Sequence, residues 1–256
     1  MKRFIVFAFM ACCSASMFAQ GMYWQSTTEA ADGKHTEESF AMPKMFKIVR
    51  TGETRNSSTI IFRLDKQLLW MLNPEEKTYS EMTFADMEKM ANKGAERMAA
   101  MKERMKEMPE ERRKMMEKMM GANDQPVEVK NTGESKTVSG YKCTKFLVLR
   151  GGEEMMSLWV TDGLKEFKPL MADWKSFSER MSAMTARFAK GMSDIYAKIN
   201  GFPMQTTLSV MGQTMTTSVT KVEKRTVPSG EFEVPAGYKK VKSEMENAME
   251  KMDKEN

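Results

Sequence analysis

The chain is poor in the residues that most enzymes use for nucleophilic chemistry. Its 256 residues include one histidine, His35, and three cysteines. A hydrolytic nucleophile needs a base beside it, and His35 stands in a polar segment that is typical of a flexible, solvated surface region. The sequence also lacks G-x-S-x-G, H-E-x-x-H, C-x-x-C and Walker phosphate-loop motifs. We therefore expect a protein that is not an enzyme and uses no cofactor.

Long apolar runs are scarce as well. A membrane-spanning helix needs about 20 consecutive apolar residues, and the one clear run, Phe4 to Cys13, has about half that length. Lys2 and Arg3 precede this run and the small residues Ser14 to Ser16 follow it, which is the order of a secretory signal peptide. Residues 1–20 are predicted to be this leader. The sequence thus predicts export to the periplasm or cell envelope of a bacterium, and not an integral membrane protein.

The leader contains two of the three cysteines. Met10-Ala11-Cys12 also fits a lipoprotein signal in which Cys12 would be acylated, and this alternative stays open. Once the leader is removed, Cys143 is the single cysteine, so no internal disulfide can form. Cys143 lies in an alternating apolar stretch and is predicted to be buried and inert.

Charge gives little sign of a nucleic-acid partner. The formal net charge is +5, and residues of both signs are interspersed along the chain. A balance of this kind favours solubility, and no nucleic-acid partner is expected.

Alternation of apolar and polar residues predicts short strands. Turn-forming residues such as Asp65-Lys66, Asn73-Pro74 and Gly151-Gly152 separate several of them. The predicted strands are Phe46 to Ile48, Ile60 to Leu64, Leu68 to Leu72, Thr78 to Ser80, Val127 to Lys130, Tyr141 to Leu149, Met156 to Val160, Met204 to Met211 and Met215 to Val222.

Two segments have helical periodicity. The first, about 83–121, has methionines every three or four residues among lysines, arginines and glutamates. Thr83 and Asp86 predict its N-terminus, and Pro109 predicts a break after Met108. The second, 169–200, has apolar residues three, four or seven apart.

The order of strands, helix, strands, helix and strands predicts an α+β fold. We expect one domain, residues 21–240, in which an antiparallel and incompletely closed β-barrel (a half-barrel) wraps around the two inserted amphipathic helices. Residues 241–256 are expected to form a charged, frayed tail.

Methionine is the compositional anomaly, with 30 residues. A methionine-rich helix face can fit apolar ligands of varied shape. Thioethers also bind Cu(I), so a copper-binding or oxidant-buffering protein is an alternative. The third interpretation is that the methionines simply fill a core. The candidate metal ligands are Met101, Met105 and Met108, or Met115, Met116, Met119 and Met120.

Several stretches resemble the domain-of-unknown-function 4412 family of exported bacterial proteins. The main one is the hairpin Ile60 to Tyr79, which contains Leu68-Leu69-Trp70-Met71-Leu72-Asn73-Pro74. The others are Ser139 to Lys145, Leu158 to Asp162, Gly201 to Met204 and Phe232 to Tyr238, in the same order along the chain. Together they extend over most of the chain that follows the leader.

The hairpin also resembles the periplasmic lipoprotein-carrier and lipoprotein-receptor superfamily. That resemblance implies an unclosed antiparallel barrel whose concave face holds acyl chains, with helices across its opening. The long, charged, methionine-rich segment 83–121 departs from typical carriers. Because fold transfers poorly to function, carrier activity is an analogy.

The leading hypothesis is a non-enzymatic envelope protein that binds a lipid, a lipoprotein or another hydrophobic ligand. The predicted ligand-binding residues are Trp70, Leu72, Phe146, Trp159, Met181, Met184 and Phe188. A further alternative is a structural envelope protein whose amphipathic helix, 83–121, protrudes and docks on a protein partner or membrane surface.

Overall fold

The computed structural model describes residues 19–31, 33–52, 57–121, 127–170, 172–173, 175–176, 195, 198–210, 213–243 and 246–247. The strands are β1 (Ala19–Ala30), β2 (Gly33–Met42), β3 (Met45–Gly52), β4 (Ser58–Arg63), β5 (Leu68–Asn73), β6 (Thr78–Thr83), β7 (Val127–Val138), β8 (Tyr141–Arg150), β9 (Glu153–Thr161), β10 (Phe202–Val210), β11 (Gln213–Val227) and β12 (Lys239–Lys240). The helices are α1 (Phe84–Lys106) and α2 (Glu110–Gly121), with short 3₁₀ turns η1 (Lys165–Phe167) and η2 (Ser229–Phe232).

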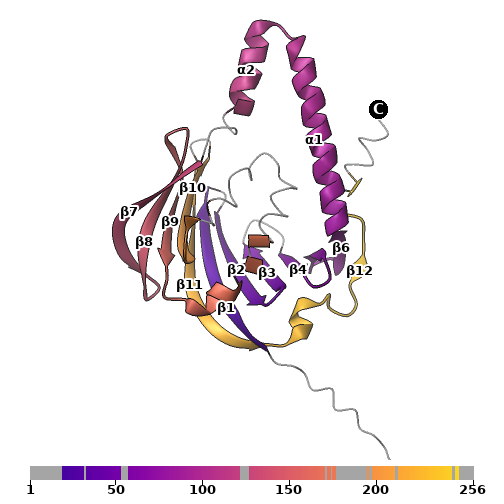
Figure 1. The fold of residues 1–256 in the computed structure, drawn as a ribbon. Coiled ribbons are helices and arrows are strands. Elements are labelled where there is room, and N and C mark those ends of the chain that lie inside the picture. Colours follow the sequence, from indigo (N-terminus) through magenta and orange to yellow (C-terminus); the bar gives the residue numbers. More distant parts are fainter. Residues whose placement is uncertain are drawn as a thin grey trace, which may run out of the picture.

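These strands form one open sheet in the order β12-β6-β5-β4-β3-β2-β1-β11-β10-β9-β8-β7. Neighbours are antiparallel except β12 and β6, which are parallel. Figure 1 shows the sheet curved from β7 at one edge to β12 at the other. The prediction of an unclosed antiparallel sheet is confirmed. The described chain is richer in sheet and poorer in helix than the predicted α+β half-barrel wrapped around inserted helices.

The polar segment around His35 was predicted to be flexible, and that prediction is wrong. It forms the long β1–β2 hairpin, in which Thr27 pairs with Thr36. β1 is held from its other side by β11, and its Met22, Trp24 and Ser26 alternate as buried residues. His35 lies in β2 opposite Gly52 of β3. A Cβ atom on Gly52 would lie 2.4 Å from His35 Nδ1, so a larger residue at position 52 would force the His35 ring to move.

The first helical prediction is confirmed in detail. Thr83 caps α1 in a reciprocal capping box with Asp86, and the helix ends before Pro109, where α2 begins. α1 follows β6 near one edge of the sheet and α2 precedes β7 at the other, so the pair connects the two edges. In Figure 1 the two helices rise from the sheet as a hairpin. They stand at the end of the sheet, not wrapped within it.

Most of the second predicted helix, 169–200, lies outside the described residues. Three of its apolar residues are described and buried: Leu170 at 5%, Ile195 at 0% and Ile199 at 2% exposure. The predicted leader, apart from residues 19 and 20, also lies outside the described part of the chain. Among the residues that are described, no helix has the length and apolar character needed to cross a membrane.

The main core lies on the inner face of the curved sheet. Phe46, Phe62 and Leu69 of neighbouring strands are each 1% exposed there, and α1 adds Phe84 and Met87. Farther along the sheet, Trp24, Phe167 and Phe202 make mutual edge-to-face contacts with centroids 4.6–6.2 Å apart. These contacts attach the segment around η1 to the sheet.

Cys143 belongs to the same core and is fully buried, as predicted. Its Sγ donates to the Tyr141 carbonyl at 3.3 Å. Burial raises the pKa of its thiol, which keeps the sulfur protonated and unreactive.

A second cluster lies on the opposite, outer face of β3–β6. There Ile61, Trp70 and Leu72 are covered by Phe232, which is 0% exposed. Residues from Pro228 to Tyr238 thus form a strap over the outside of the sheet. A third cluster contains Val148, Leu158 and Ile195, near the β7 edge.

Candidate ligand-binding site

The predicted ligand-binding residues do not gather at one place. Trp70 and Leu72 lie in the outer cluster, Phe146 packs against the third cluster and Trp159 against the main one. Lys136 and Lys145 place their ammonium groups 4.2 and 5.8 Å from the Trp159 ring centroid. Met181, Met184 and Phe188 lie outside the described residues. Of the four that are described, Leu72 alone lines the cavity considered next.

A cavity of about 910 Å³ lies where β4 begins, β5 ends and β6 begins, beside the chain that follows β12. This volume falls within the range of roughly 300–1,000 Å³ that is usual for ligand pockets. Apolar surface comes from Met71, Leu72, Tyr79 and Val241, and hydroxyl groups come from Ser58, Thr78, Ser80 and Ser243. An apolar wall with a few polar groups suits an amphipathic ligand.

Strand pairing explains how these side chains meet. Met71 pairs with Ser80 across β5 and β6, and Asn73 pairs with Thr78 two residues along, so both pairs share a sheet face. Leu72 and Tyr79 form the intervening pair, which faces the outer cluster. The cavity therefore lies at the end of β5 and β6, where side chains from both faces of the sheet can line it.

The Asn73-Pro74 turn forms the rim of the cavity. Asn73 Oδ1 accepts hydrogen bonds from the backbone N–H groups of Glu75 and Glu76, both at 3.1 Å. This bonding pattern is typical of asparagine in tight turns. The turn closes at Lys77, whose φ of 52° is left-handed. The local sequence thus fixes the loop that brings Glu76 to the cavity.

Residues 239–243 form the opposite wall: Val241, Lys242 and Ser243 line the cavity, and Lys239 and Lys240 attach them to β6. The Lys239 N–H donates to the Lys77 carbonyl at 2.9 Å, and the Val241 N–H donates to the Tyr79 carbonyl at 2.8 Å. Ser243, 3% exposed, exchanges two hydrogen bonds with Glu246: the Glu246 N–H donates to Ser243 Oγ at 3.0 Å, and the Ser243 N–H donates to the Glu246 carboxylate at 2.7 Å. The start of the predicted charged tail is therefore ordered, while residues 248–256 lie outside the described chain.

Glu81 links this wall to β5. Its carboxylate accepts from Lys240 Nζ and from Trp70 Nε1, both at 2.8 Å. These hydrogen bonds lower the pKa of Glu81, and the bond from Lys240 has the larger effect. The same contact raises the pKa of Lys240. The buried indole N–H of Trp70 is thereby satisfied at the edge of the outer cluster.

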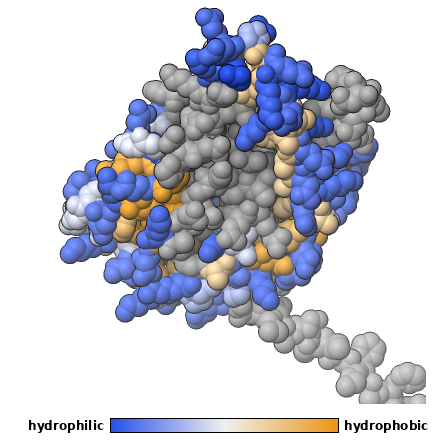
Figure 2. Space-filling model, turned by 45° about the horizontal axis from the view of Figure 1, so that its top comes forward, coloured by the Kyte–Doolittle hydropathy of each residue, from blue (hydrophilic) through white to orange (hydrophobic). Residues whose placement is uncertain are grey.

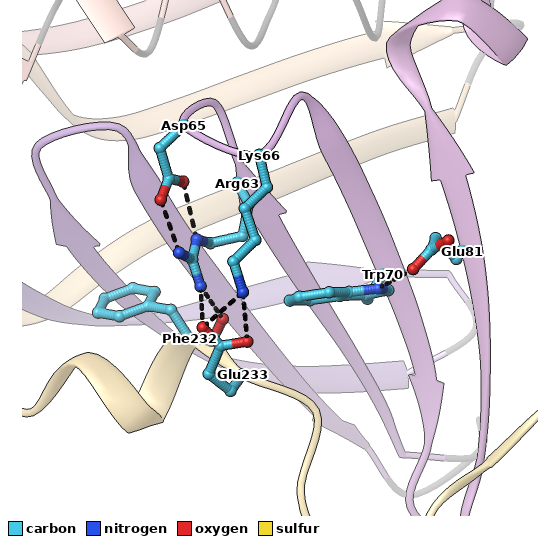
Figure 3. A network of polar contacts seen from close by, with 7 residues as sticks. All are labelled: Arg63, Asp65, Lys66, Trp70, Glu81, Phe232 and Glu233. Atoms are coloured by element: carbon cyan, nitrogen blue, oxygen red, sulfur yellow. Dashed lines mark hydrogen bonds and ion pairs between the residues drawn. The ribbon is translucent and has the colours of Figure 1, made fainter.

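An arginine on β4 fixes the strap upstream of this wall (Figure 3). Arg63, whose side chain is 8% exposed, forms a two-point contact with Asp65 at 2.6 and 2.8 Å. It also donates to the Phe232 carbonyl at 3.1 Å and to the Glu233 carboxylate, which Lys66 contacts from the other side. The planar guanidinium satisfies several acceptors at once, which a lysine could not do.

The ionisation of this network follows from its contacts. The hydrogen bond with Arg63 lowers the pKa of Asp65, and the hydrogen bond with Asp65 raises the pKa of Arg63. Burial disfavours ionised Glu233, but hydrogen bonds from Lys66 and Arg63 outweigh it and lower its pKa. All these groups are charged near neutral pH.

These shifts predict acid sensitivity. Asp65 and Glu233 have lowered pKa values in the folded protein. In the unfolded chain their pKa values return to about 3.8 and 4.5, so as the pH falls the unfolded chain binds protons before the folded protein does. The stability that the two carboxylates contribute is complete above the unfolded-chain pKa values. It is lost as the pH falls through the lower pKa values of the folded protein. We expect the Tm to fall between about pH 5 and pH 3, and to fall less in the double variant Asp65→Asn, Glu233→Gln.

The matched control is Glu153→Gln, which neutralises an exposed glutamate in β9, far from the strap in strand order. Its Tm profile should follow the wild type. Equal acid sensitivity of the double variant and the wild type would show that the network does not control this transition.

The candidate metal ligands are described in part. Met101 and Met105 lie four residues apart in α1, Met108 lies just after its end, and Met105 is 5% exposed. Met115 of α2 is 68% exposed, and nothing is described for the Met119 side chain. Figure 2 shows a line of moderately apolar residues along the otherwise hydrophilic α1. Within the described chain, no group of three or more His, Cys, Asp or Glu residues could hold a metal ion.

Together, the sheet order and the cavity define an open, mostly antiparallel β-sheet protein with a helical hairpin at one end and a C-terminal strap. The family model for the domain of unknown function DUF4412 matches residues 93–238, which is more than half of the chain. The chain belongs to this family. No curated protein matches its sequence.

Three solved structures illustrate the similarity of fold. An uncharacterized conserved protein from Thermus thermophilus is 8% identical, with 87% of this chain and 90% of that chain covered and a TM-score of 0.46. MucB in complex with MucA(peri) is 9% identical, with coverages of 88% and 57% and a TM-score of 0.41. The Pseudomonas aeruginosa MucA/MucB complex is 10% identical, with coverages of 86% and 56% and a TM-score of 0.42.

This chain covers less than two thirds of each chain matched in the two MucB structures. All three TM-scores lie below 0.5. These structures therefore give this protein neither a ligand nor a partner.

Proposed function

We propose that this protein is a non-enzymatic binding protein of the bacterial envelope that holds an acyl chain or a similar apolar ligand. The observation that carries the proposal is the cavity of about 910 Å³ between β5, β6 and the C-terminal wall. Export is proposed from the leader, residues 1–20.

The wall chemistry supports an apolar chain with a small polar end. Met71 is unbranched and adapts to ligands of different shape. Leu72, Tyr79 and Val241 extend the apolar surface, while hydroxyl groups such as that of Thr78 offer hydrogen bonds to a polar end. Burial of apolar surface provides about 25 cal/mol per Å², so an alkyl chain gains affinity with each buried methylene.

The test is native mass spectrometry of the protein purified without detergent from its host envelope. A bound mass of several hundred daltons that fragments as a lipid supports the proposal and identifies the ligand class. Binding of cis-parinaric acid, a fluorescent fatty acid, then measures affinity. An apo mass together with no detectable probe binding would refute lipid binding.

The variant Thr78→Trp tests whether this cavity is the site. Thr78 is half-buried and lines the cavity, so an indole there fills part of the volume, and we expect the probe affinity to fall at least tenfold. Thr207→Trp is the matched control, because Thr207 is a half-buried strand threonine on β10 that does not line the cavity. Equal losses in both variants would place the ligand elsewhere.

A copper site is the second candidate function. It is favoured by the thioethers of Met101 and Met105 in α1 and of Met108 just after its end, because such sulfurs bind Cu(I). The same mass spectrum tests it through increments of one copper. Met→Leu changes at these positions conserve volume, so they should abolish copper uptake and leave the fold intact.

A further inference from the structure

We propose that residues 239–243 are a detachable wall of the cavity, and that the part of the strap upstream of Gly237, residues 228–236, stays in place as its anchor. The ligand would enter and leave when β12 separates from β6. This inference rests on the proposed function, because it concerns how the same cavity is opened.

The anchor is held by buried contacts. Phe232, the last residue of η2, is 0% exposed within the outer cluster that also contains Ile61, Trp70 and Leu72. Arg63 binds both the Phe232 carbonyl and the Glu233 carboxylate, as Figure 3 shows. Releasing this part would expose an aromatic ring and leave a nearly buried guanidinium with fewer partners, both of which are costly.

Apart from Ser243, which is 3% exposed, the wall is held by weaker contacts. β12 contains two residues, Lys239 and Lys240, and pairs in parallel with β6, the less stable kind of pairing. Its side-chain link is the ion pair between Lys240, 56% exposed, and Glu81, 26% exposed. Ion pairs in contact with solvent contribute little to stability.

A turn separates the two parts. Gly237 has φ of 86°, a left-handed conformation that glycine adopts without strain, and a Cβ at this position would meet open space. The Tyr238 N–H donates to the Pro235 carbonyl at 3.4 Å across this turn. Because glycine has two accessible backbone regions, rotation at Gly237 can move Tyr238 and residues 239–243 together while Phe232 stays buried.

Burial of the Val241 side chain would favour closure of the wall over an apolar ligand. Its side chain is 44% exposed although it lines the cavity. Contact with an alkyl chain would remove part of this surface from water. A filled cavity should therefore hold the wall more firmly than an empty one.

The first measurement needs no ligand. Amide hydrogen exchange by NMR should show Lys239 and Val241 exchanging at least 100-fold faster than Phe62 of central strand β4, because their bonds break on local opening. Equal protection of the three amides would show that the wall opens only with the sheet and would overturn the inference.

The second measurement uses a disulfide to hold the wall closed. Lys239 and Thr78 are register partners, so the double variant Thr78→Cys, Lys239→Cys places two cysteines within disulfide reach. Cys143 is fully buried and does not compete. We expect cis-parinaric acid to leave the oxidised protein at least tenfold more slowly than the reduced protein. Both forms carry the same substitutions, so effects on the cavity lining cancel.

Glu81→Gln gives an independent readout in a protein with an unchanged cavity lining. Loss of the Lys240 ion pair should increase exchange at Val241 and accelerate probe release several-fold. If the wild type binds no probe, the proposed function fails, while the exchange contrast still decides the mobility of the wall. If probe is released equally by all variants, the wall is not the gate.

Discussion

Replacing Phe232 by alanine is expected to lower the free energy of unfolding by about 3–5 kcal/mol, which is typical for loss of a buried aromatic ring. Phe232 is 0% exposed and covers Ile61, Trp70 and Leu72 on the outside of the sheet. The truncation would leave a cavity beneath η2 and expose the outer cluster. For a protein of this size the Tm should fall by roughly 6–20 °C, measured by circular dichroism.

The location of the damage distinguishes this variant from a general loss of stability. Hydrogen exchange should increase most in residues 228–243, with less change in β7–β9 at the far side of the sheet. Phe232→Leu keeps most of the apolar volume and should cost about 1 kcal/mol. A Phe232→Ala protein as stable as the wild type would mean that the strap does not contribute to the fold.

Replacing Phe202 by alanine should cost a similar amount, about 3–5 kcal/mol, on the opposite face of the sheet. The Phe202 ring is 4% exposed and lies edge-to-face against Trp24, 5.5 Å away, and Phe167, 4.6 Å away. Its removal leaves a cavity beside both rings and weakens the attachment of η1 to the inner face. Urea denaturation with tryptophan fluorescence follows this change directly, because Trp24 is part of the contact.

Phe202→Leu separates packing volume from aromatic geometry. Leucine fills most of the space but makes no edge-to-face contact, so we expect a loss of about 1–2 kcal/mol. If the leucine and alanine variants were equally destabilised, the orientation of the rings and not the volume would dominate. If neither lost stability, Phe202 would not connect η1 to the sheet.

Local patterns in the sequence predicted much of the fold. The alternating stretches from Phe46 to Val222 correspond to β3–β6 and β7–β11, although several strands extend beyond the predicted bounds. Thr83, Asp86 and Pro109 predicted where α1 begins and where it gives way to α2. These features depend on neighbours a few residues apart, which a sequence displays directly.

The β1–β2 hairpin could not be predicted in the same way. Its inner face has small polar residues as well as apolar ones, since Ser26 and Ser39 are 3% and 1% exposed. Hydrophobic alternation therefore breaks down, and the segment resembles a polar loop. β1 gains its order from pairing with β11, almost 200 residues later in the chain, and such a partner cannot be seen locally.

The candidate site, like the fold, was predicted in part from local sequence and depends in part on distant segments. The resemblance drew attention to the Ile60 to Tyr79 hairpin, and its Leu72 does line the cavity. Trp70, two residues away on the same strand face, does not line the cavity; like Leu72, it is covered by Phe232 of the strap, which comes much later in the chain. Val241 and Ser243 were assigned to a frayed tail because charged residues surround them. Pairing of β12 with β6 makes them a wall.

The sequence by itself determined the local elements: the strands and their turns, the capped methionine-rich helix and its break at a proline, and the buried Cys143. Periodicity, capping and backbone restrictions act within a few residues, so they determine these features without the rest of the fold. Only the tertiary structure decided which sheet face each strand buries and that residues 228–243 cover the outer face and close the cavity. Those outcomes depend on contacts between distant segments, whose energy becomes available only when the whole sheet forms.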